Sequence, residues 1–462
     1  DALTSNTTAN YNIGIGRRAL KSNTTGTDNV ALGSHALHDN TTGNYNTALG
    51  RDTLGTVTTG SNNTAVGYSA LVSSTASHNT GVGYMSLYTN TTGAENTALG
   101  QSSLKMNTTG ARNTAIGGAS QLSVTTGSDN TSVGRDTLYT TTTGASNVAV
   151  GSDALKANTT ASHNTGIGYK AGNATTTGGY NTSVGSNTLL VNTTGYNNVA
   201  IGRDSLKTST TGVDNTAVGS EALKYNTTAN YNTAIGKAAL QANTTGSQNT
   251  AVGLSSADAN TTGGDLVAMG WHALTTNTTG NSNVGIGSQA LHNNTSGSNN
   301  IGIGFKALYA NNLGHSNVGI GHESFYRSTT GNTNTGVGYK TLRNATSGDD
   351  NTAFGASALE TCTTASDNTA VGSSALFANT TGTENVAVGR SALITNTTGS
   401  YNTAVGKHSM KANSTGASNT IIGYKSFYNG SGSYNTALGS NVMYEPASGN
   451  YNTGMGNRAL NK

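Results

Sequence analysis

The stretch Asn232-Thr233-Ala234-Ile235-Gly236 decides the fold, because versions of it recur along the whole chain. Close copies occupy residues 215–219, 249–253 and 402–406, and looser copies occupy 12–16 and 452–456. We count 27 copies, and their starting positions follow a period of 17, except for two intervals of 16 that end at Asn79 and Asn435. A short fixed period of this kind is typical of solenoids and fibrous arrays, in which each repeat stacks on its neighbours.

The composition excludes several classes of protein. Hydrophobic residues make up 33% of the chain and charged residues 9%, both below globular averages, yet an apolar residue kept at a constant phase argues against disorder. The net charge is +3, and no basic stripe with interleaved aromatic residues is visible, so nucleic-acid binding is not expected. The single cysteine, Cys362, excludes an intrachain disulfide and a thiolate metal site. The sequence has no apolar run of about 18 residues, so no segment is expected to insert into a membrane.

The leading asparagine of each copy is position 1 of the repeat. Position 2 is mostly Thr, position 3 is Ala, Gly or Ser with one exception, and position 4 is a large apolar residue in all 27 copies, such as Ile15 or Phe354. This alternation predicts a short strand over positions 1 to 4, with position 4 in the core. Position 5 is Gly in every copy, which indicates a turn with positive φ or a close approach of backbone; examples are Gly16, Gly33, Gly50, Gly219, Gly236, Gly253 and Gly406.

The rest of the repeat contains turn signals. Positions 6 to 11, such as 220–225, fit a second strand or one helical turn, and the adjacent Ala222 and Leu223 favour the turn. Positions 12 to 15 most often read Asn-Thr-Thr-Gly, as at 243–246, which is turn chemistry. Position 15 is Ala five times, so it requires a small residue more than a left-handed backbone. Position 12 is expected to be at least half buried, because it also accepts Val57, Val124, Ala345 and Cys362.

The pattern predicts an all-β fold, a β-solenoid (β-roll or β-helix) of 27 repeats with a period of 17 and one coil per repeat. We expect one continuous array over residues 1–462, open at both ends, with coils about 4.8 Å apart. Like side chains then form ladders, including asparagine ladders at positions 1 and 12 that contain Asn215, Asn232, Asn249, Asn226, Asn243 and Asn260. Only positions 4 and 9 are reliably large and apolar, so the core is thin and lateral association, most simply as a trimer, is expected.

The phrase Asn-Thr-Ala-Val-Gly at 63–67, followed by Ala70, resembles the head repeats of trimeric autotransporter adhesins, although the period of those repeats is shorter. The order of the motifs Asn-Thr-Ala-x-Gly, Ala-Leu and Asn-Thr-Thr-Gly within each repeat resembles that in repeats of bacterial and phage tail-fibre-type proteins. The resemblance covers essentially the whole chain. It implies a homotrimeric fibre that is extracellular, at a cell surface or on a virion.

Three recurring groups have alternative interpretations. The Asn-Thr-Thr sequences are glycosylation acceptors, but a buried asparagine ladder is favoured. The Thr pairs at positions 13 and 14 could form an ice-binding surface, but adjacent residues of a strand point to opposite sides, so turn hydrogen bonding is favoured. Aromatic residues at position 6 are candidates for contact with a ligand, and ladder stacking or packing between chains is the favoured alternative; these residues are Tyr68, Tyr84, Tyr169, Trp271, Tyr339 and Tyr424.

The histidines and acidic residues form no Ser-His-Asp set, metal cluster or phosphate loop, so we expect no enzyme activity, cofactor or metal. The predicted function is the structural shaft of an extracellular or virion fibre, which provides spacing and adhesion. The alternatives are a subunit of an extracellular filament that assembles end to end, and an ice- or glycan-binding β-solenoid. The expected partners are copies of the chain and cell-surface glycans, without nucleic acid or membrane insertion.

Overall fold

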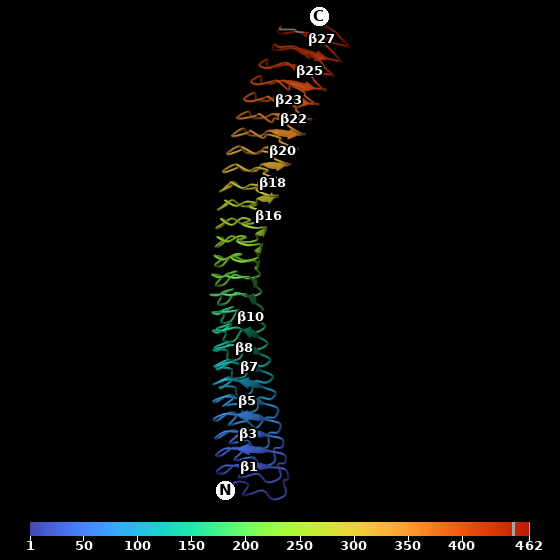
Figure 1. Cartoon of the computed structure of the whole chain (residues 1–462). Helices are drawn as coiled ribbons and strands as arrows, with labels where there is room; N and C mark the ends of the chain where they lie inside the picture. Colours follow the sequence, from blue (N-terminus) through green and yellow to red (C-terminus); the bar gives the residue numbers. More distant parts are fainter. Residues whose placement is uncertain (446–448, 462) are drawn as a thin grey trace. The chain divides into compact units, whose positions relative to one another are not determined.

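The computed structural model describes residues 1–445 and 449–461, which divide into two compact units. Unit 1 comprises Asp1–Tyr231 and unit 2 comprises Asn232–Lys462. The regular elements of the described residues are 27 short strands, each covering three positions of the repeat (Figure 1).

The strands of unit 1 are β1 (Ile13–Ile15), β2 (Val30–Leu32), β3 (Thr47–Leu49), β4 (Thr64–Val66), β5 (Thr80–Val82), β6 (Thr97–Leu99), β7 (Thr114–Ile116), β8 (Thr131–Val133), β9 (Val148–Val150), β10 (Thr165–Ile167), β11 (Thr182–Val184), β12 (Val199–Ile201) and β13 (Thr216–Val218). Those of unit 2 are β14 (Thr233–Ile235), β15 (Thr250–Val252), β16 (Val267–Met269), β17 (Val284–Ile286), β18 (Ile301–Ile303), β19 (Val318–Ile320), β20 (Thr335–Val337), β21 (Thr352–Phe354), β22 (Thr369–Val371), β23 (Val386–Val388), β24 (Thr403–Val405), β25 (Thr420–Ile422), β26 (Thr436–Leu438) and β27 (Thr453–Met455).

Within each unit, successive strands pair in parallel with the register of the repeat. Thr233 of β14 faces Thr250 of β15, the same position one repeat later. The shortened repeat keeps the same register, because Thr64 of β4 faces Thr80 of β5. The missing residue is therefore absorbed in the turns. Each repeat forms one coil of a parallel β-solenoid, which confirms the predicted fold class (Figure 1).

The strand occupies positions 2 to 4, one residue shorter than the predicted positions 1 to 4, and the rest of the coil consists of turns and bends. Ala19 N donates to Gly16 O at 3.3 Å, and Asn23 N donates to Leu20 O at 3.3 Å. Positions 6 to 11 therefore form turns and not a second strand, which agrees with the favoured interpretation. No helix in the described part of the chain is long and apolar enough to cross a membrane.

The prediction that position 4 lies in the core is wrong. Ala234 at position 3 is fully buried, whereas Ile235 at position 4 is 42% exposed. Successive side chains of a strand point to opposite faces, so burying position 3 places positions 2 and 4 outside. The interior is filled by small residues at positions 3 and 8 and by Leu at position 9, for example Ala31, Ala36 and Leu37.

Both expectations for the two glycine positions are confirmed. The position-5 glycines have φ between 109° and 142° in all 27 copies. A Cβ on Gly100 would lie 2.6 Å from the carbonyl oxygen of Gly117 in the next coil, so two separate constraints require glycine there. The glycines at position 15 are not among the residues with positive φ. Ala161 and Ala229, which replace glycine at this position, are buried.

Left-handed backbone also occurs at residues that the sequence did not single out. Positions 7, 9 and 17 have positive φ, with values of 58° at Arg18, 50° at Leu20 and 58° at Asp28. This conformation costs an L-residue roughly 1–2 kcal/mol. Hydrogen bonds between coils hold it, since Leu20 N donates to Ala36 O at 3.0 Å and His35 N donates to Arg17 O at 2.8 Å.

Candidate functional site

Two buried asparagine ladders join neighbouring coils, as predicted. At position 1, Asn249 N donates to Asn232 Oδ1 at 3.0 Å, and Asn249 Nδ2 donates to Gly263 O at 3.0 Å. At position 12, Asn260 Nδ2 donates to Asn243 Oδ1 at 2.8 Å and to Gly263 O at 2.9 Å. All of these asparagines are buried, as are Asn215 and Asn226 of unit 1. The ladders are structural, and their amides are not accessible for binding in the folded chain.

The position-12 ladder of unit 1 is interrupted where valine replaces asparagine. Val124 follows Asn107 by one coil and precedes Thr141 by one coil, and both polar side chains are buried. Among the described residues, Asn107 Oδ1 and Thr141 Oγ1 have no hydrogen-bond partner. Valine at this position is therefore compatible with burial but leaves Asn107 Oδ1 unpaired, whereas hydroxyls at this position are also unpaired after an asparagine, as at Thr175.

The threonines at position 13 also bond from coil to coil. Thr244 Oγ1 donates to Thr261 O at 2.9 Å, and Thr261 Oγ1 donates to Thr278 O at 2.9 Å. These hydroxyls are part of the solenoid's own hydrogen-bond network, as the favoured turn interpretation expects. A row of threonine hydroxyls free to contact ice is not found at this position in these coils.

The six predicted position-6 aromatic residues are all exposed, but the structure brings only two of them together. Tyr68 and Tyr84 stack with ring centroids 5.5 Å apart and an interplanar angle of 13°. Stacking covers the facing sides of these two rings. A ligand at this pair therefore meets ring edges and hydroxyls more readily than both ring faces.

The remaining four predicted aromatics lie apart and have neighbours of their own. The rings of Trp271 and His272 pack edge to face with centroids 4.5 Å apart, and the ring centroids of Tyr339 and His322 lie 5.5 Å apart. Lysine ammonium groups lie over the other rings, 5.2 Å from the centroid of Tyr169 and 5.4 Å from that of Tyr424. The six residues do not form one common site.

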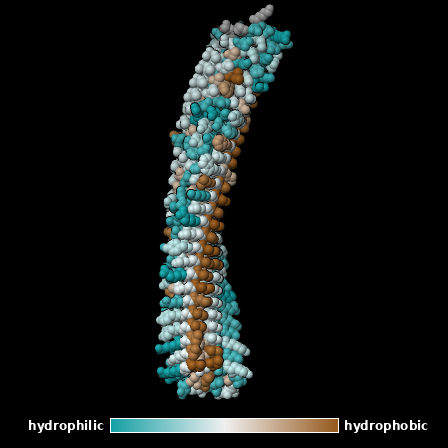
Figure 2. Space-filling view, viewed as in Figure 1, coloured by the Kyte–Doolittle hydropathy of each residue, from teal (hydrophilic) through white to brown (hydrophobic). Residues whose placement is uncertain are grey.

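The outer face of the strands carries no charge and is apolar at position 4 in every strand. Position 2 is Thr, Val or Ile and position 4 is aliphatic, Met or Phe in every strand. Figure 2 shows the resulting hydrophobic band along unit 1. Exposed position-4 side chains include Ile15, Leu32, Leu49, Leu99, Ile116, Val133, Ile167 and Ile201 in unit 1, and Ile235, Met269, Phe354, Val371, Val388, Ile422 and Leu438 in unit 2. We call this surface the strand face.

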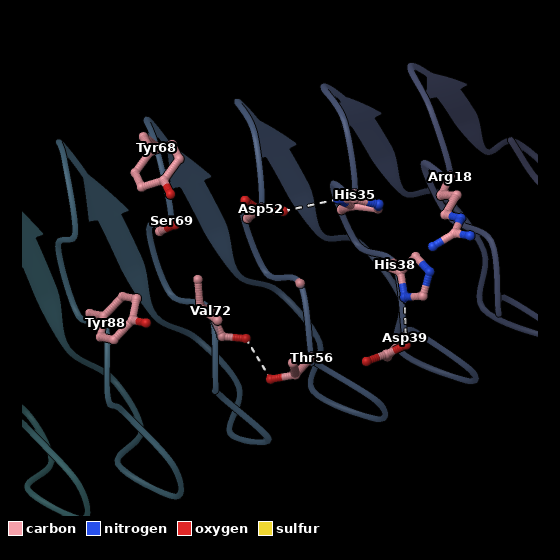
Figure 3. Close-up of a pocket in the computed structure, with 11 residues that line it drawn as sticks. Arg18, His35, His38, Asp39, Asp52, Thr56, Tyr68, Ser69, Val72 and Tyr88 are labelled. Carbon is pink, nitrogen blue, oxygen red and sulfur yellow. Dashed lines mark hydrogen bonds and ion pairs between the residues drawn. The ribbon is translucent and has the colours of Figure 1, made fainter. Parts of the chain in front are cut away.

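A hollow of about 390 Å³ lies on another side of unit 1, lined by residues between Arg18 and Tyr88 (Figure 3). It forms where position 10 carries small residues, Gly55 and Val72, between the larger His38 and Tyr88. The row of side chains at position 10 is thus locally interrupted. The size falls within the range of small-ligand sites.

Two histidine–carboxylate pairs line this hollow. His35 Nδ1 lies 3.1 Å from Asp52 Oδ1, and His38 Nδ1 lies 2.6 Å from Asp39 Oδ1 (Figure 3). Arg18 contributes a guanidinium group to the same lining. Acceptors and donors therefore alternate over a short distance, an arrangement that suits neighbouring hydroxyls of a sugar, which both donate and accept. Within the described ranges, no group of three His, Cys, Asp or Glu residues is placed to hold a metal ion.

A second polar surface was missed in the sequence. The range 385–444 contains four cations and no Asp or Glu, but the cations lie in three different repeats and resemble scattered charges. The solenoid places these repeats on one another, since His408 N donates to Arg390 O at 3.0 Å and Lys425 N donates to Lys407 O at 3.1 Å. The absence of acidic residues throughout this range is the signal that could have identified the surface.

Comparison of the sequence with protein-family models and with curated proteins found no match.

Proposed function

We propose that the chain is the structural shaft of an extracellular or virion fibre, in which three copies associate laterally through the strand face. The observation that supports this proposal best is the row of exposed position-4 side chains, which is apolar in every coil. Extended apolar patches on a soluble protein mark interaction sites, whereas scattered apolar residues do not.

The size of the strand face is sufficient for association. Full burial of an aliphatic side chain stabilises by about 1.5–3 kcal/mol. Ile116 and Leu99 are each 38% exposed, so covering such a residue contributes about 0.6–1.1 kcal/mol on the same scale. The 13 coils of unit 1 then supply about 7–15 kcal/mol, which is comparable to the cost of association, about 4–15 kcal/mol.

A second copy is a suitable occupant because its strand face has the same spacing of rungs. Sheets pack face to face at about 10 Å with interdigitated side chains. Rows that repeat at every coil can interdigitate along their whole length only with rows of equal spacing. A copy of the chain meets this requirement at every coil. Adhesion would then use the polar surfaces that remain outside, including the hollow at Gly55, as a contact for glycans.

The experiment measures the mass of the full chain by sedimentation together with its β signal by circular dichroism. We expect a trimer for the parent chain and a monomer with the parent's β signal for a variant with Leu99, Ile116 and Val133 each replaced by Lys. The matched control places lysines at Thr92, Thr109 and Thr126, exposed residues at position 14 of neighbouring coils, and should remain trimeric. A parent that sediments as a folded monomer, or a strand-face variant that remains trimeric, would refute the proposal.

The same face supports one alternative. Thr, Val or Ile at position 2 and a large apolar residue at position 4 form two parallel rows with the spacing of the coils, a kind of surface that can order water in an ice-like lattice. If the parent chain is monomeric and inhibits ice recrystallisation, and the Leu99, Ile116 and Val133 substitutions abolish the inhibition, ice binding is the better assignment.

A further inference from the structure

Among the residues that the structure describes, a group of cations in unit 2 has no carboxylate partner. The range 385–444 contains Arg390, Lys407, Lys411 and Lys425 and no Asp or Glu. None of the ion pairs in the described residues involves these four side chains. We call this group the basic face.

Several cations elsewhere in the chain are paired with carboxylates. Arg112 Nε lies 2.7 Å from Asp129 Oδ1, Lys156 Nζ lies 2.8 Å from Asp153 Oδ1, and Arg343 Nε lies 2.9 Å from Glu323 Oε2. The variable positions of the repeat therefore supply carboxylates readily. Their absence around the basic face leaves its positive charge available to an external anion.

The four cations lie on the coils of three successive strands, β23, β24 and β25. Arg390 and Lys407 occupy position 6, Lys425 position 7 and Lys411 position 10, so all four project from the same turn region of the coil. Lys411 Nζ lies 2.8 Å from the hydroxyl of Tyr428 and 4.8 Å from the centroid of its ring.

One imidazole lies within electrostatic reach of the whole group. Burial lowers the pKa of His408 below its ordinary value, and the positive charges of the neighbouring cations lower that pKa further. In decreasing order of their effect on the pKa of His408, these cations are Lys407, Lys411, Arg390 and Lys425. The four charges thus act as one cluster, with His408 neutral among them.

We propose that the basic face binds an acidic polysaccharide whose charged sugars lie along successive coils. Coils about 4.8 Å apart present cations at intervals similar to the length of one sugar ring. The phenol hydroxyl of Tyr428 lies 2.8 Å from Lys411 Nζ, so a hydrogen-bonding group suited to sugar hydroxyls lies beside the cations. This binding refines the adhesive part of the proposed function, on which it rests, but it does not require association of three chains.

A single-stranded nucleic acid fits the basic face less well. Its binding relies on aromatic faces on which bases stack. Tyr428 stacks on Tyr444, with centroids 5.1 Å apart and an interplanar angle of 11°. The ammonium groups of Lys411 and Lys425 lie 4.8 Å and 5.6 Å from the centroid of Tyr428. The ring faces are thus largely engaged within the protein.

The experiment measures binding of the full chain to immobilised polygalacturonate, which carries one carboxylate per sugar, at several salt concentrations. The test variant replaces Lys407, Lys411 and Lys425 with Gln. The control variant makes the same change of charge at Lys156, Lys207 and Lys224, which are paired with carboxylates. Sedimentation of both variants separates failure of this proposal from failure of lateral association.

We expect the test variant to bind at least about tenfold more weakly than the parent, with the slope of log K against log salt concentration reduced by about 2–3. The control variant should stay within about twofold of the parent, and neutral dextran should not bind. Equal losses in the two variants would show a general charge effect and overturn the proposal. Unchanged binding of the test variant would overturn it too. Stronger binding of an oligonucleotide than of polygalacturonate would assign the basic face to nucleic acid instead.

Discussion

Replacing Val124 with Asn should stabilise the solenoid by repairing the position-12 ladder. The new amide would occupy the place that Asn260 occupies in unit 2, where Nδ2 donates to Asn243 Oδ1 at 2.8 Å and to Gly263 O at 2.9 Å. At residue 124 the corresponding acceptors are Asn107 Oδ1, which is buried without a partner, and Gly127 O. The hydroxyl of Thr141 should stay unpaired, because the hydroxyls of Thr175 and Ser209 are unpaired although each lies one coil after an asparagine.

The magnitude follows from the unpaired oxygen of Asn107. A buried polar group without a partner costs about 1–3 kcal/mol, so pairing Asn107 Oδ1 recovers about that amount. Removing the buried valine loses about 1.5 kcal/mol of apolar burial. We therefore expect a gain of at most about 1.5 kcal/mol in the local free energy of unfolding.

The assay is native-state hydrogen exchange, because a solenoid opens locally and a single global midpoint is a poor measure. The amide of Thr125 donates to Thr142 O at 3.0 Å and reports opening at the repaired coil. Its exchange should slow by up to about tenfold, since roughly 1.4 kcal/mol corresponds to a factor of ten. Unchanged or faster exchange at Thr125 in the variant would refute the reasoning.

The reverse substitution is the matched control. Asn243→Val removes the acceptor of Asn260 Nδ2 and the donor to Gly246 O, each at 2.8 Å. The substitutions in the sequence predict that this change is tolerated with little loss. The hydrogen bonds of the ladder revise that expectation to a loss of about 1–3 kcal/mol. A neutral Asn243→Val would show that the ladder bonds contribute little net stability.

Two further predictions concern single residues. Gly100→Val should lower the local free energy of unfolding by a few kcal/mol, because φ is 135° there and a Cβ would lie 2.6 Å from Gly117 O; limited proteolysis should cut this variant near residue 100, and parent-like resistance would contradict the steric argument. Burial raises the pKa of Cys362 to about 12, so at pH 8 labelling of its thiol should follow local opening. Because the folded pKa lies above the unfolded one, the stabilising contribution of this thiol is complete below about pH 8.5 and is lost as pH rises towards 12. Rapid labelling of the folded chain at pH 8 would contradict its burial.

The period, the position-5 glycine and the burial of position 12 could be predicted by comparing the internal copies, which show the residues that each position accepts. A position that never changes identifies the glycine, and a position that accepts Val57, Val124 and Cys362 identifies an apolar environment. These inferences need no knowledge of which face of the strand points inward.

The orientation of the strand could not be predicted from the same pattern. The usual rule places the larger residue of Ala234 and Ile235 inside, but position 3 lies close to the leucine at position 9. A Cβ on Gly285, at position 3, would lie 3.1 Å from Leu274 Cγ. Small residues therefore occupy position 3 in every copy but one, where Ile421 is fully buried, and the aliphatic residue at position 4 points outward. Alternation alone identifies a strand but does not show which of its two faces points to the interior.

The two exposed rows of the solenoid provide an internal comparison. Ile235 at position 4 and Tyr68 at position 6 have the same exposure, 42%. Position 6 takes Arg17, Ser34, Gly118, Lys407 and other residues, as expected for a surface in contact with water, whereas position 4 stays large and apolar in all 27 copies. Exposure to water does not explain this difference, because Ile235 and Tyr68 are equally exposed. Nor does the core, since position 4 lies outside it. The lateral association proposed above would explain the difference, and it would involve every coil, because the last copies at Leu438 and Met455 keep the pattern as strictly as the first.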